Sequence, residues 1–260
     1  MTGKNSGARG GAPRYALYVA PEPDSGLAGF AAAWLGRDPG GKDSTWPTGS
    51  REISRTRLRA LTATPRHYGF HATLKPPFRL VDGARPEDLL KAVQDFVRGQ
   101  KPVAFAGLQL AAIGGFLALV PAGSCAAIDR LAADCLRFFE PFRAPARQEE
   151  IERRKRRGLS PRQEQLLYRW GYPYVLEEFR FHFTLTGPLG RQREKEILQN
   201  NLAAITEKFR HRPYSIESIC VFSQPSLRHP FQLIERFAFA GQREESATPT
   251  PAAKGMEADG

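Results

Sequence analysis

The chain has 260 residues, of which 41% are hydrophobic, enough to bury one substantial core. Its 38 Lys and Arg outnumber its 27 Asp and Glu, and the net charge of +11 favours anionic partners such as phosphorylated molecules or nucleic acid. Three widely spaced cysteines argue against a disulfide framework, and the lack of an apolar run of about 18 residues argues against a membrane span. Without an apolar leader segment, the sequence predicts a cytoplasmic protein with no membrane contact.

The two ends, residues 1–12 and 241–260, predict disordered tails because both are rich in Gly, Pro, Ala and charged residues. Residues 13–240 predict a single α+β domain. In chain order, its first half predicts a strand at 14–20, a helix at 25–36, a long loop at 37–51, a strand at 68–74 stopped by Pro76 and Pro77, a helix at 86–100, and a hairpin of strands at 103–111 and 115–121.

The pattern then restarts, because FLALVP at 116–121 resembles ALYVAP at 16–21. The second half predicts a helix at 124–139, a basic helical insertion at about 145–172, a strand at 179–187, a helix at 191–210, and strands at 214–222 and 231–239. The order strand, helix, strand, helix, strand therefore occurs twice. We expect a duplication with one sheet-containing lobe at about 13–112 and a second at about 113–240.

One five-residue pattern occurs in both halves, as FHATL at 70–74 and FHFTL at 181–185. Side chains two apart in a strand share a face, so His71 and Thr73 point the same way, with Lys75 beyond them. On the second strand Arg180, His182 and Thr184 share a face by the same rule. The opposite faces predict core residues: Phe70, Ala72, Leu74, Phe181, Phe183 and Leu185. A single His in a strand is usually a packing residue, but two copies in a repeated architecture favour a two-part active site.

Two imidazoles, two hydroxyls and one or two cations suit phosphoester cleavage without a metal or other cofactor. One His can take a proton from the attacking oxygen while the other donates one to the leaving oxygen. Thr73, Thr184 and the cations Lys75 and Arg180 would hold the phosphate oxygens, although either cation could simply be solvated. A metal site formed by the two His is less favoured, because no Asp or Glu lies at short spacing and Thr is a poor zinc ligand.

The basic segment 147–175 has two interpretations. Ser160-Pro161 followed by Gln163 predicts a helix at about 161–169, with another helix before it. This pair is either a solvated helical hairpin or a wall that gives positive potential to an anionic ligand. RNA binding is less favoured, since no RNA-binding motif accompanies the charge. Tyr68, Trp170 and Tyr172 are candidates to contact a substrate, and packing is their alternative role.

Two H-x-[ST] motifs in a duplicated chain resemble the 2H phosphoesterase superfamily, which includes 2′,3′-cyclic phosphodiesterases and RNA-end-processing enzymes. The longer strings YGFHATLKPPF (68–78) and RWGYPYVLEEFRFHFTLTGPL (169–189) resemble its branch linked to bacterial phosphonate utilisation. The resemblance spans nearly the whole chain between the tails. It implies a bilobal fold with the active site in a central cleft, and His71, Thr73, His182 and Thr184 match its motif.

The resemblance and the residues together predict a cyclic phosphodiesterase acting on a ribose phosphate or a nucleotide. The branch implies a small substrate, such as a ribose 1,2-cyclic phosphate that carries a 5-phosphate and is opened in phosphonate catabolism. Two alternatives stay open: an RNA-processing phosphodiesterase acting on 2′,3′-cyclic ends or 2′–5′ linkages, and a non-catalytic nucleotide- or RNA-binding module. The near-equivalence of the two His leaves their acid and base roles unassigned.

Overall fold

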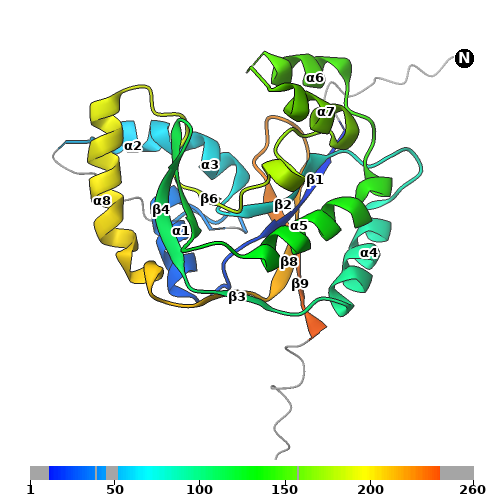
Figure 1. The fold of residues 1–260 in the computed structure, drawn as a ribbon, viewed down its shortest axis with the longest axis horizontal. Coiled ribbons are helices and arrows are strands. Elements are labelled where there is room, and N and C mark those ends of the chain that lie inside the picture. Colours follow the sequence, from blue (N-terminus) through cyan, green and yellow to red (C-terminus); the bar gives the residue numbers. More distant parts are fainter. Residues whose placement is uncertain (1–11, 39, 45–51, 157, 241–260) are drawn as a thin grey trace, which may run out of the picture.

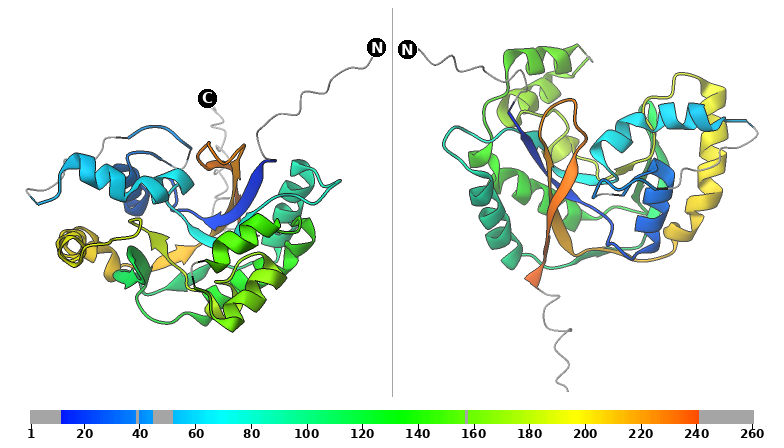
Figure 2. Two further views of the ribbon diagram at one scale, coloured as in Figure 1. Left: turned by 90° about the horizontal axis from the view of Figure 1, so that it is seen from above. Right: turned by 180° about the vertical axis from the view of Figure 1, so that it is seen from behind.

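The computed structural model describes residues 12–38, 40–44, 52–156 and 158–240, which form a mixed α/β fold with helices around antiparallel sheets (Figures 1 and 2). Apart from Ala12, the predicted tails lie outside the described residues, and so do residues 45–51 of the predicted loop. Among the described residues, no helix combines the length and apolar character that crossing a membrane requires.

The strands are β1 (Arg14–Val19), β2 (Ala72–Phe78), β3 (Val103–Phe105), β4 (Leu108–Ile113), β5 (Phe116–Pro121), β6 (Phe183–Thr184), β7 (Tyr214–Ile216), β8 (Ser218–Gln224) and β9 (Gln232–Ala238). The helices are α1 (Gly26–Leu35), α2 (Arg55–Leu61), α3 (Ala63–Tyr68), α4 (Pro86–Arg98), α5 (Ala126–Phe138), α6 (Gln148–Lys155), α7 (Pro161–Trp170) and α8 (Gln192–Arg210), with short 3-10 helices η1 (Glu140–Phe142) and η2 (Leu176–Glu178). Most predicted elements are confirmed, whereas α2 and α3 occupy a stretch for which the sequence analysis gave no element.

The largest sheet has the strand order β2-β1-β8-β9, with every neighbouring pair antiparallel. Its central strand β1 is buried from Tyr15 to Val19, since it has a strand on each side. The predicted boundary between two contiguous lobes does not match this sheet. Strands β8 and β9, which the sequence analysis assigned to the second lobe, complete the sheet of β1 and β2.

A second sheet has the order β4-β5-β6, so β5 lies between its neighbours as β1 lies between β2 and β8. The predicted hairpin at Gly114 and Gly115 is confirmed, with Ile113 opposite Phe116. Strand β4, which the sequence analysis placed at the end of the first lobe, therefore belongs with the strands of the second. The small β3–β7 pair runs along the lower edge of the molecule in Figure 1.

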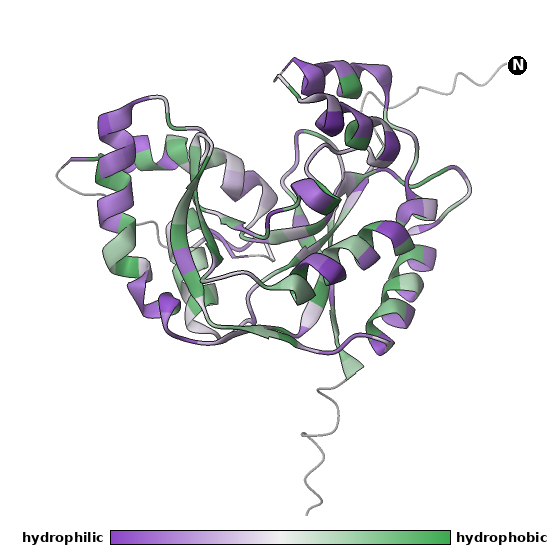
Figure 3. Cartoon of the chain, viewed as in Figure 1, coloured by the Kyte–Doolittle hydropathy of each residue, from purple (hydrophilic) through white to green (hydrophobic). Residues whose placement is uncertain are grey.

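The helices begin at residues that cap them. The Ser25 hydroxyl accepts a hydrogen bond from the Ala28 amide at the start of α1, and the predicted Ser160–Gln163 capping box starts α7. Helix α8 lies beside β4, whereas α4 and α5 lie at the other end of the molecule (Figure 1). Figure 3 shows that α6 and α7 present mostly hydrophilic residues, as the predicted basic hairpin implies.

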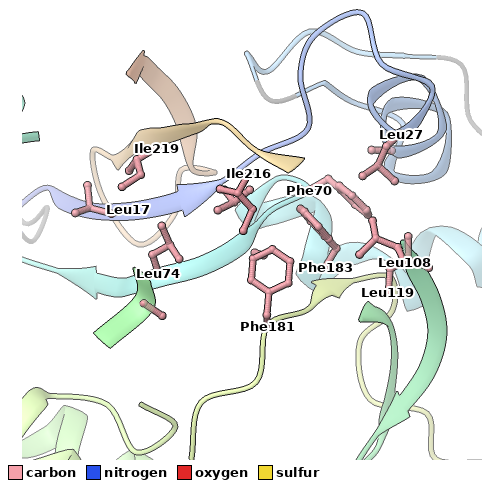
Figure 4. Packing of buried hydrophobic residues seen from close by; sticks show 14 of the residues in the cluster. Leu17, Leu27, Phe70, Leu74, Leu108, Leu119, Phe181, Phe183, Ile216 and Ile219 are labelled. Carbon is pink, nitrogen blue, oxygen red and sulfur yellow. The ribbon is translucent and has the colours of Figure 1, made fainter. Parts of the chain in front are cut away.

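The core between the sheets contains the residues expected on the hidden faces of the two His segments. All six predicted core residues are 5% exposed or less. Figure 4 shows Phe70, Phe181 and Phe183 meeting there, with the rings of Phe70 and Phe183 stacked at 5.1 Å. The two His segments are therefore packed against each other through the residues next to the imidazoles.

Four predicted strands have wrong limits. The predicted strand at 103–111 is two strands, β3 and β4, and the one at 214–222 is also two, β7 and β8, each pair divided between two sheets. Strand β2 continues through Pro76 and Pro77 to Phe78. It is an edge strand, where a missing proline N–H can face away from the sheet and costs no ladder bond. The second strand is much shorter than predicted, since only Phe183 and Thr184 pair with β5, and η2 ends just before the segment that leads to them.

Candidate active site

His71 directly precedes β2, after a tight turn that ends α3 at Gly69. Gly69 has φ +77°, a conformation that a residue without a side chain adopts at no steric cost. The Nδ1 atom of His71 lies 2.9 Å from the carbonyl oxygen of Gly69, and its ring stacks on Tyr18 at 3.7 Å. Strand β1 and the turn therefore fix the orientation of this imidazole.

His182 directly precedes β6 and is held in the same way. Its Nδ1 atom lies 2.7 Å from the carbonyl oxygen of Arg180, also two residues earlier. The ring of Phe116 on β5 lies 5.6 Å away. The two imidazoles thus have equivalent positions. Each lies one residue before an edge strand, and each contacts the carbonyl oxygen two residues earlier.

The shared contact sets the tautomer of both rings. A carbonyl oxygen only accepts hydrogen bonds, so Nδ1 of each neutral ring carries the proton and Nε2 carries the lone pair. Neither Nε2 atom has a hydrogen-bond partner within the described residues. Each His therefore presents a nitrogen that can take a proton, or give one once protonated.

The packing brings the two imidazoles to one region. Phe70 and Phe183 stack on each other in the core, and each is the chain neighbour of one of the two His. The charge of His182 acts on His71 and lowers its pKa, so the two rings lie within electrostatic range of each other. That the two imidazoles form one site stays a prediction.

Burial is the main electrostatic effect on both rings. Loss of solvent, together with the charge of His182 and despite the Gly69 hydrogen bond, lowers the pKa of His71 to about 4. Burial also lowers the pKa of His182. Removal from water disfavours a charged imidazole, so both rings are neutral near pH 7 when no anion is bound.

The two threonines lie next to the imidazoles on the paired strands. Thr73 on β2 is opposite Tyr18, and Thr184 on β6 is opposite Ala118. Both side chains are half-buried. Within the part of the chain that the structure describes, their hydroxyls form no hydrogen bond, so both remain available to a ligand.

Lys75 does not share the face of His71 and Thr73, and the prediction that it does is wrong. Its side chain is 1% exposed and pairs with Glu140 at 3.0 Å, and its ammonium also donates to the Leu136 carbonyl at 3.1 Å. The cause is a register shift: Tyr18 pairs with Thr73, but the preceding residue of β1 pairs with Lys75. The extra residue breaks the alternation of faces, and Lys75 is not available to a substrate.

Arg180 is exposed, and it makes no ion pair within the described residues. It lines a groove of about 400 Å³ beside β4, the end of β5 and the start of α5, together with Ser124, Cys125 and Asp129. Phe181, the residue between Arg180 and His182 in the chain, also lines this groove. The predicted role of Arg180 in substrate binding stays a prediction that this location permits.

The three aromatic candidates have different surroundings. Tyr68 lies 6.3 Å from the His71 ring and stacks on Phe231. Tyr172 is half-buried and acts electrostatically on Tyr18, the residue stacked on His71. Trp170 packs against a small apolar cluster of Leu136, Leu166 and Val175. Tyr68 is therefore beside His71, whereas Tyr172 packs against the same apolar cluster as Trp170.

Sequence reasoning did not single out two residues of this region. The sequence predicts that Tyr18 lies in a strand, and only the pairing of β1 with β2 brings its ring onto His71. Arg154 was one of several cations in the basic segment, and its half-buried position beside Tyr172 follows from the packing of α6. No local sequence pattern marks Tyr18 or Arg154, because the position of each beside the site depends on contacts between distant segments.

No cluster of three or more His, Cys, Asp or Glu residues that could hold a metal ion occurs within the described ranges. The three cysteines are free thiols, and burial raises the pKa of Cys135 to about 12 and of Cys220 to about 11. Neither of these two buried thiols is therefore ionised near pH 7, which makes them poor nucleophiles.

Comparison with known proteins gives a family and named relatives. A family model described as "Protein of unknown function (DUF1045)" matches residues 73–232. Two curated relatives are called ribose 1,5-bisphosphate phosphokinase PhnN. The one from Janthinobacterium sp. (strain Marseille) is 37% identical over 240 residues, 91% of this chain and 53% of the relative. The one from Laribacter hongkongensis (strain HLHK9) is 34% identical over 224 residues, 85% of this chain and 50% of the relative.

The chain thus spans about half the length of the curated relatives it matches. Among solved structures, Usb1 of Kluyveromyces marxianus covers 87% of this chain and 98% of its own chain, at 10% identity and a TM-score of 0.37. That likeness is too low to support an argument about the fold.

Proposed function

The chain belongs to the DUF1045 family, and we propose that it is a cyclic phosphodiesterase that opens a cyclic phosphate on a ribose phosphate or a nucleotide without a metal ion. The observation that carries this proposal is the pair of imidazoles with matching tautomers. Each Nδ1 is held by the carbonyl two residues earlier, which leaves two Nε2 atoms for proton transfer.

The reaction needs one proton removed and one supplied. Water attacks the cyclic phosphorus, and Nε2 of one His takes its proton as the new P–O bond forms. Nε2 of the other His, protonated in the complex, gives its proton to the ring oxygen as the P–O bond to that oxygen breaks. The hydroxyls of Thr73 and Thr184, with Arg180, are proposed to hold the non-bridging oxygens. The product is a phosphomonoester with one new hydroxyl.

We infer that the two sheets are halves of one duplicated fold, with a central cleft between two lobes. Strand order supports this: β2-β1-β8 corresponds to β6-β5-β4, with the His-bearing segment at the edge each time. The last strand of each half is exchanged, since β4 joins the sheet of β5 and β8 joins the sheet of β1. This exchange also explains why the contiguous lobes expected from the sequence do not match the sheets.

A ribose phosphate is the substrate class that the relatives favour, because their name specifies ribose 1,5-bisphosphate. A role in phosphonate catabolism rests on the resemblance of residues 68–78 and 169–189 to the phosphonate-linked 2H branch. A ribose cyclic phosphate, the substrate that this resemblance implies, is also a ribose phosphate, so it agrees with the name of the relatives.

A kinase is the second candidate, because the relatives are named phosphokinases. The chain's own residues favour it less. GRDPGGK at 36–42 fits the start of a phosphate-binding loop, but Asp43 stands where that pattern requires Ser or Thr. The segment also follows helix α1, whereas such a loop follows a strand. Since the chain spans about half of each relative, the named activity can belong to the other half.

The test is a substrate panel offered to purified protein after EDTA treatment. The panel contains ribose cyclic phosphates, nucleoside 2′,3′-cyclic phosphates, oligonucleotides with cyclic ends, and ribose 1,5-bisphosphate with ATP. We expect turnover of a ribose cyclic phosphate that is lost in both His71→Ala and His182→Ala. His211→Ala, which changes an exposed His at the end of α8, is the matched control and should keep full activity.

Each alternative gives a different result. Preference for oligonucleotides would favour an RNA-processing enzyme, and binding without turnover would favour a nucleotide- or RNA-binding module. ATP-dependent phosphorylation of ribose 1,5-bisphosphate would favour the kinase. Loss of turnover in EDTA, restored by a divalent ion, would contradict the metal-free mechanism.

A further inference from the structure

Arg154 on α6 is less exposed than its neighbours Arg153 and Arg156, which are open to solvent. Its guanidinium lies 5.0 Å over the Tyr172 ring, and the residue is half-buried. Within the described part of the chain it has no ion pair and no hydrogen bond. By contrast, Lys155 pairs with Glu164 at 3.3 Å and Arg162 pairs with Glu177. Arg154 is thus a partly desolvated charge without a carboxylate of its own.

Glu150, the carboxylate whose charge acts on Arg154, already forms an ion pair with Arg79. The charge of Glu150 raises the pKa of Arg154, but its Oε1 accepts a hydrogen bond from Arg79 at 2.7 Å. Burial lowers the pKa of Arg154, but an arginine remains charged near neutral pH. A half-buried positive charge without a partner is costly, and binding an anion there would offset that cost.

The position of Arg154 points to the same ligand as the imidazoles. Its charge interacts with Tyr172 and with Tyr68, and the Tyr68 ring lies 6.3 Å from His71. Tyr172 in turn interacts with Tyr18, which stacks on His71. The charged group that lowers the pKa of His71 itself is His182. Arg154 therefore lies over Tyr172, and its charge reaches Tyr68, whose ring is beside His71.

Helix α6 is fixed to the strand that follows His71. Besides the Arg79–Glu150 ion pair, the Ala144 amide donates to the Arg79 carbonyl at 2.8 Å, and Leu80 and Arg143 form a β-bridge. Arg79 and Leu80 directly follow the end of β2. Arg154 is thereby held at a set place relative to His71 before any ligand binds, which reduces the ordering cost of binding.

We propose that Arg154 is a specificity-determining residue that binds a second anionic group of the substrate, a phosphomonoester, while the cyclic phosphate lies between the imidazoles. The planar guanidinium suits two-point binding of phosphate oxygens. Tyr68 and Tyr172 lie where the sugar between the two groups would contact them. The proposal rests on the proposed function for the identity of the first group, but its binding test does not.

The kinetic test compares two substrates, a ribose cyclic phosphate with and without a 5-phosphate. Arg154→Ala is expected to lower kcat/KM about 10- to 100-fold for the phosphorylated substrate, the usual cost of losing a charge-assisted contact, and to leave the other substrate unchanged. Arg154→Lys should restore part of the loss. Arg153→Ala removes the same charge from an exposed site on the same helix and should have little effect.

The binding test uses ribose 5-phosphate as the probe, with ribose as the control, measured by calorimetry. Wild-type protein should bind the phosphate ester about 10- to 100-fold more tightly than Arg154→Ala does. If no cyclic phosphate is turned over but this difference holds, the proposed function falls and the inference stands. Equal binding by the two proteins, no binding by the wild type, or an equal kcat/KM loss for both substrates with a lower Tm would overturn the inference.

Discussion

Binding of a phosphate-like anion between the imidazoles should transfer a proton from solvent to the protein. Burial and the charge of His182 lower the pKa of His71 to about 4, so the free ring is neutral at pH 6. An anion against Nε2 stabilises the imidazolium and opposes the effect of burial, which raises the pKa of the ring. Because the proposed reaction needs one protonated His in the complex, this uptake would also supply the general acid.

The expected size follows from the pKa of His71 before and after binding. With a pKa of about 4, roughly 1% of the free rings carry the second proton at pH 6. If the anion restores the ordinary value of about 6.5, roughly three quarters of the bound rings do. The uptake from His71 is therefore about 0.7 proton per anion bound at pH 6. At pH 8 it should nearly vanish, because the bound ring is then mostly neutral as well.

The measurement is a calorimetric titration with sulfate, which stays a dianion across this pH range, in two buffers of different ionisation enthalpy. The difference between the two observed enthalpies gives the number of protons taken up. His71→Gln should remove the share that comes from His71, and His211→Gln should not change the uptake. Sulfate binding at pH 6 without proton uptake would refute either the low pKa of His71 or the location of the anion.

Three further predictions concern stability. As the pH falls from 7 to 4, His71 of the unfolded chain, with a pKa of about 6.5, becomes protonated, whereas the folded ring stays neutral until about pH 4. The free energy of unfolding of the wild type should therefore fall by about 1 to 3 kcal/mol more than that of His71→Gln, measured by urea titration. Glu140→Gln should cost about 3 kcal/mol in the same assay, because it leaves the buried Lys75 without its carboxylate, and Lys75→Met should cost less. Gly107→Ala should lower the Tm, since its Cβ would lie 2.3 Å from the carbonyl oxygen that ends α8, whereas Gly190→Ala meets no atom and should not.

The residues of the two His segments could be read from sequence because their signal is local. Alternation of apolar and polar side chains identified the core-facing Phe70 and Phe183 and the opposite-facing His71 and His182. The capping box at Ser160 was likewise visible within four residues. Such features depend on neighbours in the chain, and the structure agrees with them.

Lys75 shows where local reasoning fails. The rule that residues two apart share a face holds only while the strand stays in register with its neighbour, and the register of β2 shifts after Thr73. That shift arises from pairing with β1, some 55 residues earlier in the chain. Arg154 and Tyr18 could not be predicted from the sequence for the same reason, since their place beside the site depends on which distant segments pack together.

The proposed exchange of strands would give a physical basis for the proposed site of two imidazoles. His71 and His182 each precede an edge strand that, among the described residues, pairs with one central strand, β1 or β5. Each central strand has on its other side a strand from the opposite half of the sequence, β8 or β4. A half of the sequence alone would leave its central strand with an open edge, which is an unfavourable arrangement in water. The proposed reaction needs the two imidazoles at a set distance on both sides of one phosphate, and the pairing that completes each sheet would hold the strand that follows each imidazole in place.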